Sequence, residues 1–283
     1  MTLFRLDASI RVDGSASREI ADIVEQEWLT AHPGDTVVRR HIGVDVLPAD
    51  AWADAVSAQF APPEKHTPAQ QAAVALAVTL ADELLNADAI LLAVPLYNFG
   101  VSQHIKTWID LITSDPRGAT RGSPLLAGKP VVLATVRGGA YGPGTPREGW
   151  DHSTPYLKRI LADVWGANLT VVEREFTLVG VNPALDAFKD LAAEMHAGAL
   201  RSAREAGRAL GVPVAAQSLP DSATATSMSR GCAMRAIEDV VRRKVAAHPG
   251  IMFELRSILG DDAQRSWENI DLAPPKSRTE TGT

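Results

Sequence analysis

The first 210 residues alternate between short apolar segments and longer segments whose apolar positions recur at helical spacing. The short segments predict five strands, at residues 3–7, 36–40, 89–93, 130–135 and 169–173. Residues 89–93 are apolar without alternation, which is typical of a strand buried on both faces of a parallel sheet. Pro95 ends this strand because proline has no backbone N–H to donate.

The longer segments predict helices between the strands. Residues 17–31 carry Ile20, Val24 and Trp28 on one face. Further helices are predicted at residues 49–59, 67–86, 154–165 and 183–210, and one follows Gly100. Because strands and helices alternate, the pattern predicts an α/β fold with a doubly wound, five-stranded parallel sheet and helices on both faces.

The pattern changes after Gly211. Residues 213–229 are rich in Ala, Ser, Thr and Pro and are typical of a linker, while 232–247 and 251–259 each carry a short apolar stripe. The last ten residues have the composition of a disordered tail. We therefore divide the chain into a domain at 1–210 and a C-terminal helical or disordered extension at 211–283, to which the sequence assigns no role.

The composition of the chain argues against several classes of function. A net charge of −6 over 283 residues argues against binding nucleic acid through its phosphates. The single cysteine, Cys232, excludes an internal disulfide and a Cys-x-x-Cys redox pair, and the seven histidines show no metal-ligand spacing. No apolar run approaches 18 residues, and the N-terminus lacks a signal-peptide pattern. We therefore expect a soluble cytoplasmic protein with no metal, nucleic-acid or membrane partner.

The first candidate site segment joins the first strand to the first helix, at residues 8–17. It offers the hydroxyls of Ser9, Ser15 and Ser17 beside free N–H groups at the start of a helix, where an anion is favoured. It matches neither the Gly-x-Gly-x-x-Gly fingerprint nor a Walker loop. It suits a terminal phosphate monoester, or it is a plain helix cap with spare serines.

Two more loops follow the third and fourth strands. Residues 96–99, with Tyr97 and Phe99, offer a flat apolar surface with amide groups, or they are a loop that caps the core. Residues 136–142 contain Gly138 and Gly139, which allow close backbone approach. In such a sheet, ligands bind beyond the carboxyl ends of the strands. A phosphate site and a planar-ring site at one sheet edge describe flavin mononucleotide (FMN).

Four segments of the chain resemble the FMN-dependent NADH-azoreductase family. They are 9–17, the block Pro95-Leu-Tyr-Asn-Phe-Gly100 with Lys106-Thr-Trp-Ile-Asp110, Arg137-Gly-Gly139, and Thr154-Pro-Tyr-Leu157. The similarity covers about residues 1–210. It implies a flavodoxin-like fold, a homodimer and bound FMN, and it gives no counterpart to the extension.

The resemblance also implies which residues contact the cofactor. The phosphate-side positions are Ser9, Ser15, Ala16 and Ser17, and the isoalloxazine-side positions are Leu96, Tyr97, Asn98, Phe99, Val136, Arg137, Gly138 and Gly139. Leu96 stands where the family commonly has Met, and Val136 where it commonly has Ser, so a hydroxyl contact is lost there. Phe99 and Tyr141 are candidate walls of the acceptor pocket, although Tyr141 is equally compatible with packing on the sheet.

These observations predict an oxidoreductase that passes two electrons from NADH or NADPH, through bound FMN, to quinones and aromatic azo compounds. Since donor and acceptor share one pocket, we expect a ping-pong mechanism. No catalytic side chain is assigned because the flavin carries the chemistry. A flavodoxin-type electron-transfer module and a non-catalytic flavin-binding redox sensor remain the alternatives.

Overall fold

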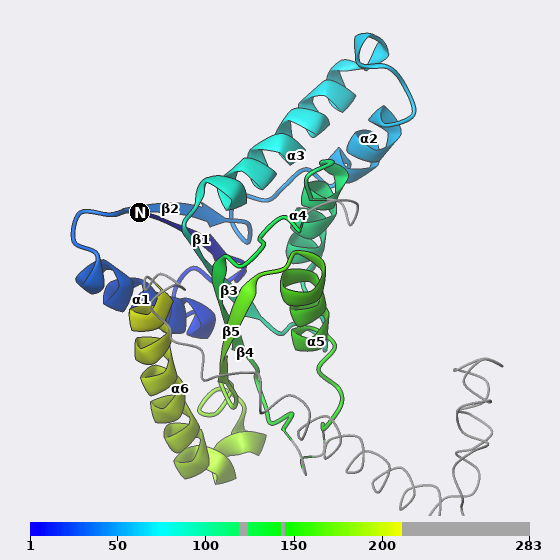
Figure 1. The fold of residues 1–283 in the computed structure, drawn as a ribbon. Coiled ribbons are helices and arrows are strands. Elements are labelled where there is room, and N and C mark those ends of the chain that lie inside the picture. Colours follow the sequence, from blue (N-terminus) through cyan, green and yellow to red (C-terminus); the bar gives the residue numbers. More distant parts are fainter. Residues whose placement is uncertain (119–123, 143–144, 146, 211–283) are drawn as a thin grey trace, which may run out of the picture. The chain divides into compact units, whose positions relative to one another are not determined.

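The computed structural model describes residues 1–118, 124–142, 145 and 147–210 of the chain (Figure 1). The predicted extension at 211–283 lies outside the described residues. Five strands form one parallel sheet: β1 (Thr2–Asp7), β2 (Thr36–His41), β3 (Ala89–Pro95), β4 (Pro130–Val136) and β5 (Asn168–Arg174). The five predicted strands and their parallel arrangement are confirmed.

The strand order is β2-β1-β3-β4-β5. The chain therefore adds β2 on one side of β1 and the three later strands on the other. The point where the order reverses lies between β1 and β3, and in doubly wound sheets this is where ligands bind.

The α-helices are α1 (Ala16–Ala31), α2 (Ala51–Ala58), α3 (Pro68–Asn86), α4 (Gln103–Ser114), α5 (Thr154–Lys158) and α6 (Lys189–Leu210). Capping residues explain two of the helix starts. Ser102 accepts a hydrogen bond from the N–H of Ile105, and Thr67 forms a capping box with Gln70.

Two of the predicted helices are not regular α-helices throughout. The helix expected at 154–165 continues from α5 into a π-helical segment, η2 (Arg159–Val164), where Trp165 N–H donates to Ile160 C=O at 2.8 Å. The wider turn accompanies the burial of Trp165, which meets Trp108 edge-on. The helix expected at 183–210 begins as a 3₁₀ segment, η3 (Pro183–Phe188), and another 3₁₀ turn, η1 (Pro63–Lys65), precedes α3.

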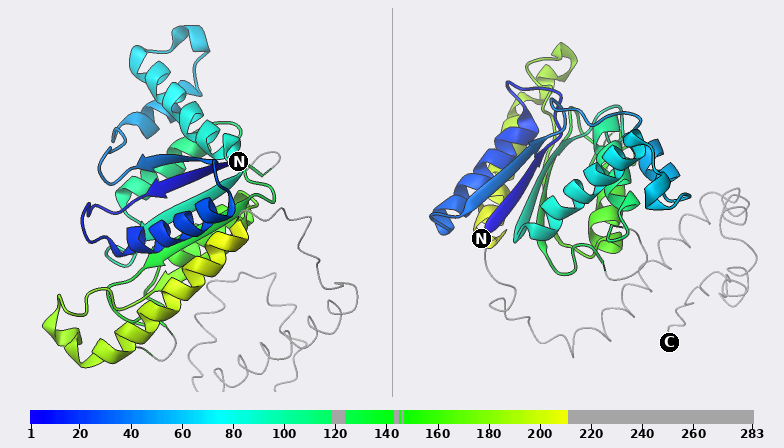
Figure 2. Two further views of the ribbon diagram at one scale, coloured as in Figure 1. Left: turned by 90° about the vertical axis from the view of Figure 1, so that its left-hand side faces the viewer. Right: turned by 90° about the horizontal axis from the view of Figure 1, so that it is seen from above.

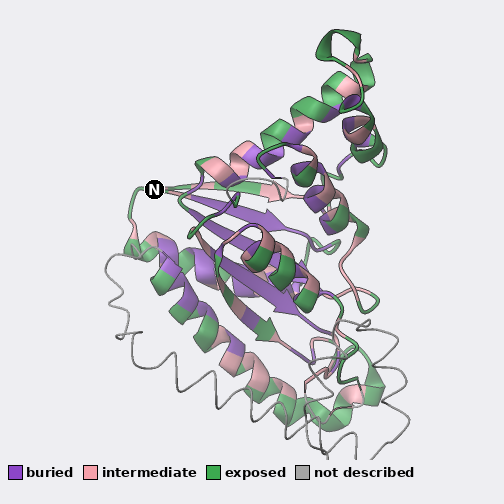
Figure 3. Cartoon of the chain, turned by 45° about the vertical axis from the view of Figure 1, so that its right-hand side comes forward, coloured by how far each residue is buried: buried purple, intermediate pink, exposed green. Residues whose placement is uncertain are grey.

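Helices cover both faces of the sheet, and Figure 2 shows the three layers most clearly. On one face, α1 and α6 bury Val24, Trp28 and Ala203 against the strands. On the other, α3, α4 and α5 bury a larger cluster that includes Leu80 and Trp108. Successive side chains of a strand point to opposite faces, so both faces of β3 are buried, and Figure 3 shows the central strands in the colour of buried residues.

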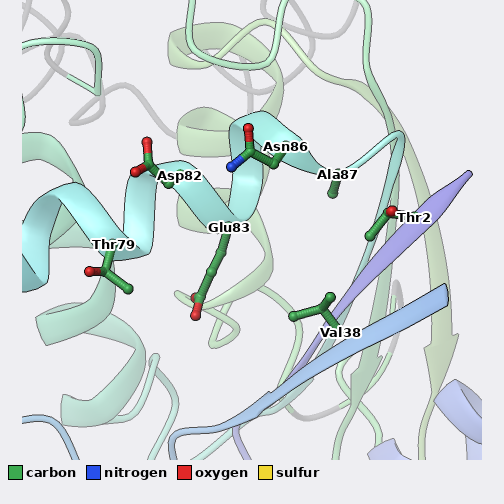
Figure 4. Close-up of a pocket in the computed structure, with 7 residues that line it drawn as sticks. All are labelled: Thr2, Val38, Thr79, Asp82, Glu83, Asn86 and Ala87. Atoms are coloured by element: carbon green, nitrogen blue, oxygen red, sulfur yellow. The ribbon is translucent and has the colours of Figure 1, made fainter.

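One pocket, of about 290 Å³, lies at the amino ends of the strands, where β1 starts and α3 ends (Figure 4). Its lining residues are Thr2, Val38, Thr79, Asp82, Glu83, Asn86 and Ala87. Glu83 is already paired with Arg40. This pocket is at the opposite edge of the sheet from the predicted site. In the part of the chain that the structure describes, no helix has the length and apolar content needed to cross a membrane.

Candidate functional site

The carboxyl ends of β1, β3 and β4 are neighbours, so the loops that follow them start side by side. Ala8 N–H donates to Ala93 C=O at 3.0 Å, and Leu96 N–H donates to Val136 C=O at 2.9 Å. The three loops at 8–17, 96–100 and 136–142 therefore meet at one edge of the sheet, as the sequence predicted.

The loop at 8–17 ends at the start of α1, which Ser15 caps. The Ser15 hydroxyl accepts a hydrogen bond from the N–H of Arg18 at 3.4 Å and lies 3.3 Å from the Ser17 hydroxyl. Both serines are buried. Among the residues that the structure describes, the N–H groups of Ala16 and Ser17 have no acceptor. Two hydroxyls and two free N–H groups at a helix N-terminus form a cradle for an anion.

Ser9 ties this loop to the next one. Its buried hydroxyl accepts a hydrogen bond from the N–H of Arg11 at 3.1 Å and lies 3.3 Å from the hydroxyl of Tyr97. The Tyr97 hydroxyl also accepts from the N–H of Ile10 at 3.3 Å. The position of the predicted phosphate loop therefore depends on a side chain from the loop after β3.

A second contact holds the loop from the side of β2. The His41 Nε2 lies 3.1 Å from the Ser9 carbonyl oxygen and 2.8 Å from an Arg18 guanidinium nitrogen. Arg18 also donates to the Val12 carbonyl at 2.8 Å. Gly43 approaches so closely that a Cβ there would lie 2.1 Å from the Ser9 oxygen. Any larger residue at 43 would therefore displace the loop.

The loop after β3 is a tight turn at 97–100. Tyr97 and Gly100 exchange two backbone hydrogen bonds of 3.2 and 3.0 Å. Between them, Asn98 and Phe99 have φ of +47° and +69°. This is a type I′ turn, and a left-handed conformation is unfavourable for an aromatic residue. Within the described residues the N–H groups of Asn98 and Phe99 have no acceptor, so the turn offers two donors toward solvent.

Phe99 belongs to an aromatic cluster with Tyr141 and Trp150. Its ring centroid lies 6.5 Å from that of Tyr141 and 5.5 Å from that of Trp150, with the Trp150 ring edge-on. The backbone is held by His152, whose N–H donates to the Phe99 carbonyl at 2.9 Å. Phe99 and Trp150 remain 40% and 51% exposed, so the cluster presents an apolar surface beyond the strand ends.

Arg137, a predicted cofactor contact, is enclosed by the protein. Its buried guanidinium donates to Asp151 at 2.7 Å, to Glu173 at 3.0 Å and to Glu175 at 3.3 Å. A further bond of 3.1 Å reaches the Thr154 hydroxyl. Its backbone N–H and C=O are also bonded, to Arg174 and Thr177. Since these polar groups are all used, contact with a cofactor here is restricted to van der Waals contact.

The charges in this network support one another. Burial by itself raises the pKa of Asp151, but hydrogen bonds from Thr154 and the neighbouring Arg137 outweigh it, so the pKa lies below its ordinary value. Burial likewise opposes the charge on Arg137, and the bonds to Glu173 and Asp151 outweigh it, so the pKa of Arg137 is raised. Both groups are therefore ionised at neutral pH, and they fix the loop after β4 to the start of α5.

Gly138 and Gly139 are held through their carbonyl groups. Leu178 N–H donates to the Gly138 oxygen at 3.1 Å, and Phe176 N–H donates to the Gly139 oxygen at 3.2 Å. In the described part of the chain their own N–H groups have no acceptor. Val136 is buried at the end of β4. This loop therefore presents two further backbone donors near the aromatic cluster.

A family model described as a flavodoxin-like fold matches residues 1–197. The chain belongs to this flavodoxin-like family. It is 42% identical over 205 residues to an FMN-dependent NADH:quinone oxidoreductase from Frankia casuarinae, a match that covers 71% of this chain and 96% of the relative. The resemblance drawn from the sequence is confirmed.

Two solved structures support the fold. An azoreductase from Bacillus anthracis strain Sterne has a TM-score of 0.60 at 23% identity, and the match covers 74% of this chain and 99% of that one. An FMN-dependent NADH-azoreductase from Bacillus anthracis strain Ames Ancestor, crystallised with FMN, has a TM-score of 0.57 at 18% identity, with 72% and 100% covered. At these identities the likeness establishes the fold alone.

The donors of this flavodoxin-like chain fit a flavin mononucleotide. The free N–H groups of Ala16 and Ser17 and the adjoining hydroxyls suit a phosphate. The free N–H groups of the 97–100 turn and of Gly138 and Gly139 suit the carbonyl and nitrogen acceptors of a planar ring. Thr135 and Ser153 hold buried hydroxyls that lack a partner among the described residues. The chemistry of these groups is therefore compatible with FMN.

Sequence reasoning missed two parts of this site in the flavodoxin-like fold. Trp150 and Arg147 lie in an irregular segment without helical or strand periodicity. The one signal that could have indicated a site there is an aromatic residue close to a glycine-rich loop. Asp151 and Glu175 gave no local signal because they reach Arg137 only through the tertiary fold. Conversely, three residues of the family motif have structural roles. Trp108 is buried in the core, and Lys106 pairs with Asp110 at 2.7 Å.

Proposed function

We propose that this protein is an FMN-dependent NADH:quinone oxidoreductase that also reduces aromatic azo compounds. The observation that carries the proposal is the meeting, at one sheet edge, of a serine-lined helix N-terminus and an aromatic turn with free backbone donors. The first suits the phosphate and the second suits the ring. The name of the Frankia casuarinae relative, at 42% identity, supports the same activity.

The proposed cofactor contacts are those that the sequence predicted. The phosphate would be held by Ser9, Ser15, Ala16 and Ser17, and the ring side by Leu96, Tyr97, Asn98, Phe99, Val136, Arg137, Gly138 and Gly139. Ser15 and Ser17 act by donating hydroxyl hydrogen bonds, while Arg137 acts by holding the loop rather than by a hydrogen bond to the ring. When bound, FMN would supply the two-electron chemistry that couples NADH oxidation to reduction of the acceptor.

The chain's own residues provide binding and orientation. Backbone N–H groups of Asn98, Gly138 and Gly139 would stabilise negative charge on the ring system of a bound flavin. Phe99 and Tyr141, whose ring centroids lie 6.5 Å apart, are the proposed walls of a pocket for flat aromatic molecules. Because NADH and acceptor would occupy this pocket in turn, we propose a ping-pong mechanism.

We further propose that the protein acts as a homodimer in the cytoplasm, where NADH is available. Large apolar side chains are exposed on α2 and α3 and between them. Trp52 is 47% and Phe60 is 86% exposed, and Val74 and Val78 are also exposed on α3. Such a surface is typical of an interface. Size-exclusion chromatography with light scattering measures the mass, and a monomer at all concentrations would contradict this part of the proposal.

The function is tested with the purified full-length chain. The protein should be yellow, and the flavin released by heat should be FMN. It should oxidise NADH when menadione or an azo dye is supplied. Initial-rate plots for NADH against menadione should give parallel lines, whereas intersecting lines would argue against a shared pocket. Bound FMN without turnover would instead favour an electron-transfer module or a redox sensor.

A further inference from the structure

One cation lies at the mouth of the proposed acceptor pocket and has no assigned role. The guanidinium carbon of Arg147 lies 5.6 Å from the centroid of the Tyr141 ring, and its Nη1 donates to the Tyr141 hydroxyl at 3.3 Å. A Cβ on Gly139 would lie 3.2 Å from the same nitrogen. The guanidinium therefore lies over the loop after β4, between Gly139, a proposed contact of the flavin ring, and Tyr141, a proposed wall of the pocket.

Arg147 differs from Arg137 and Arg174, the arginines at the carboxyl ends of β4 and β5, because it lacks a counterion. In the described part of the chain no carboxylate lies within 4.0 Å of it, whereas Arg137 and Arg174 are both paired with acids. A guanidinium is always charged, and its flat fork suits carboxylate and sulfonate oxygens. Its interaction with Tyr141 holds the group in place without neutralising it. The charge is therefore available to an anion that enters the pocket.

The surroundings of Arg147 favour an anion that is carried on an aromatic ring. Phe99 and Trp150 expose much of their rings and meet edge-to-face at 5.5 Å. Phe99 also contacts Tyr141, on which Arg147 lies. An apolar wall and a cation thus lie next to each other, on the loops after β3 and β4. A flat molecule against the wall would place a ring substituent near the guanidinium.

We propose that Arg147 determines acceptor specificity by binding a carboxylate or sulfonate substituent of an aromatic quinone or azo acceptor. This inference rests on the proposed function, which it makes more specific. Arg147 contributes to acceptor binding, and electron transfer itself does not depend on it. An uncharged acceptor binds through the aromatic cluster alone, while an anionic acceptor gains a charge-assisted hydrogen bond.

The test compares the full-length holoprotein with the R147Q and R147K variants. R201Q is the matched control, since Arg201 is exposed on α6 and its loss removes the same charge. The acceptor pair is 1,4-naphthoquinone and its 2-sulfonate, each measured as kcat/KM at fixed NADH and low ionic strength. R147Q should lower kcat/KM for the sulfonate about tenfold, which corresponds to about 1.4 kcal/mol. Its kcat/KM for the uncharged quinone should stay within about twofold of the parent value.

In the other two variants, the preference for the sulfonate should depend on whether residue 147 is positively charged. R147K should restore most of the preference for the sulfonate, and R201Q should leave it unchanged. Added salt should weaken sulfonate turnover in the parent protein and hardly affect it in R147Q. A redox-inert pair, naphthalene-2-sulfonate and the neutral naphthalene-2-sulfonamide, gives a second measurement by flavin difference spectra. The Kd of the sulfonate alone should rise about tenfold in R147Q.

Three outcomes would overturn the inference. Equal losses for charged and uncharged acceptors would mean that Arg147 only supports the loop. An effect confined to the rate of flavin reduction by NADH, in stopped-flow experiments, would assign the charge to the phosphates of the donor. An unchanged Kd for the sulfonate would show that no anion binds there. Absence of all turnover in a yellow parent protein would refute the proposed function, and the Kd comparison would still decide whether Arg147 binds anions.

Discussion

The buried charge network around Arg137 gives the sharpest test of how the loop after β4 is held. We consider the substitution R137M, which keeps an unbranched apolar side chain and removes the guanidinium. In the parent protein the side chain of Arg137 is 8% exposed, and those of Asp151 and Glu175 are 12% and 9% exposed. The substitution therefore leaves two nearly buried carboxylates without their cation.

The expected cost follows from these contacts. Removing one partner of a buried ion pair costs about 3–5 kcal/mol. Asp151 keeps hydrogen bonds from the N–H groups of Ser153 and Thr154 and from the Thr154 hydroxyl, at 2.7–2.9 Å. Glu173 is 42% exposed, so its loss of a partner adds little. We therefore expect R137M to lower the free energy of unfolding by about 3 kcal/mol, at the lower end of that range.

Urea unfolding followed by circular dichroism measures this change, with FMN content measured on the same samples. The control is R159M, which breaks the exposed pair between Arg159 and Asp163 and should cost less than about 0.5 kcal/mol. In a D151N background, R137M should cost about 1 kcal/mol less, because one unpaired charge has been removed. A cost below about 1 kcal/mol for R137M alone would refute the reasoning. Loss of FMN with unchanged stability would instead show that the side chain contacts the cofactor.

Three further outcomes are expected. Replacing both Ser15 and Ser17 with Asp should abolish FMN retention, because two carboxylates would face the phosphate. Full flavin occupancy, measured by absorbance, would contradict the assignment of this loop to the phosphate. The pKa of Asp151 is lowered in the folded protein, so its ionised form stabilises the fold at neutral pH. That contribution should disappear as the pH falls below about 4 and through the lowered pKa. In unfolding titrations between about pH 5 and pH 3, D151N should therefore lose less stability than the parent. A chain that ends at Leu210 should remain folded and retain FMN, because β1 to β5 and α6 all precede that point, and an insoluble or flavin-free product would place the extension within the folded domain.

The residues around the phosphate loop illustrate how far local sequence signals reach. A serine cap, Ser15 or Ser17, could be predicted from position alone, since an N-cap acts on the N–H groups of the next few residues, and the structure has Ser15 in this role. The contact between Ser9 and Tyr97, by contrast, joins residues 88 positions apart. It exists because β1 and β3 are neighbours in the sheet. The strand order that makes them neighbours is a property of the whole chain.

The sequence by itself determined the helices and strands of this protein and the edge of the sheet at which the site would lie. Burial leaves a periodic pattern along each segment, so the unbroken apolar run of β3 and the helical stripe of α1 could be recognised without coordinates. The FMN-binding family could be recognised as well, because its motif residues lie in short contiguous blocks.

Only the tertiary structure decided the contacts between those blocks. It enclosed Arg137 among three acids, gave Phe99 a left-handed conformation, and placed Arg147 on Tyr141 beside the aromatic cluster. The pairing of Arg137 with Asp151, Glu173 and Glu175 has no local signal, because it depends on which distant groups the sheet brings within bonding distance. Side-chain pairing is a property of distances in space, while periodicity records only how each segment alternates between core and solvent.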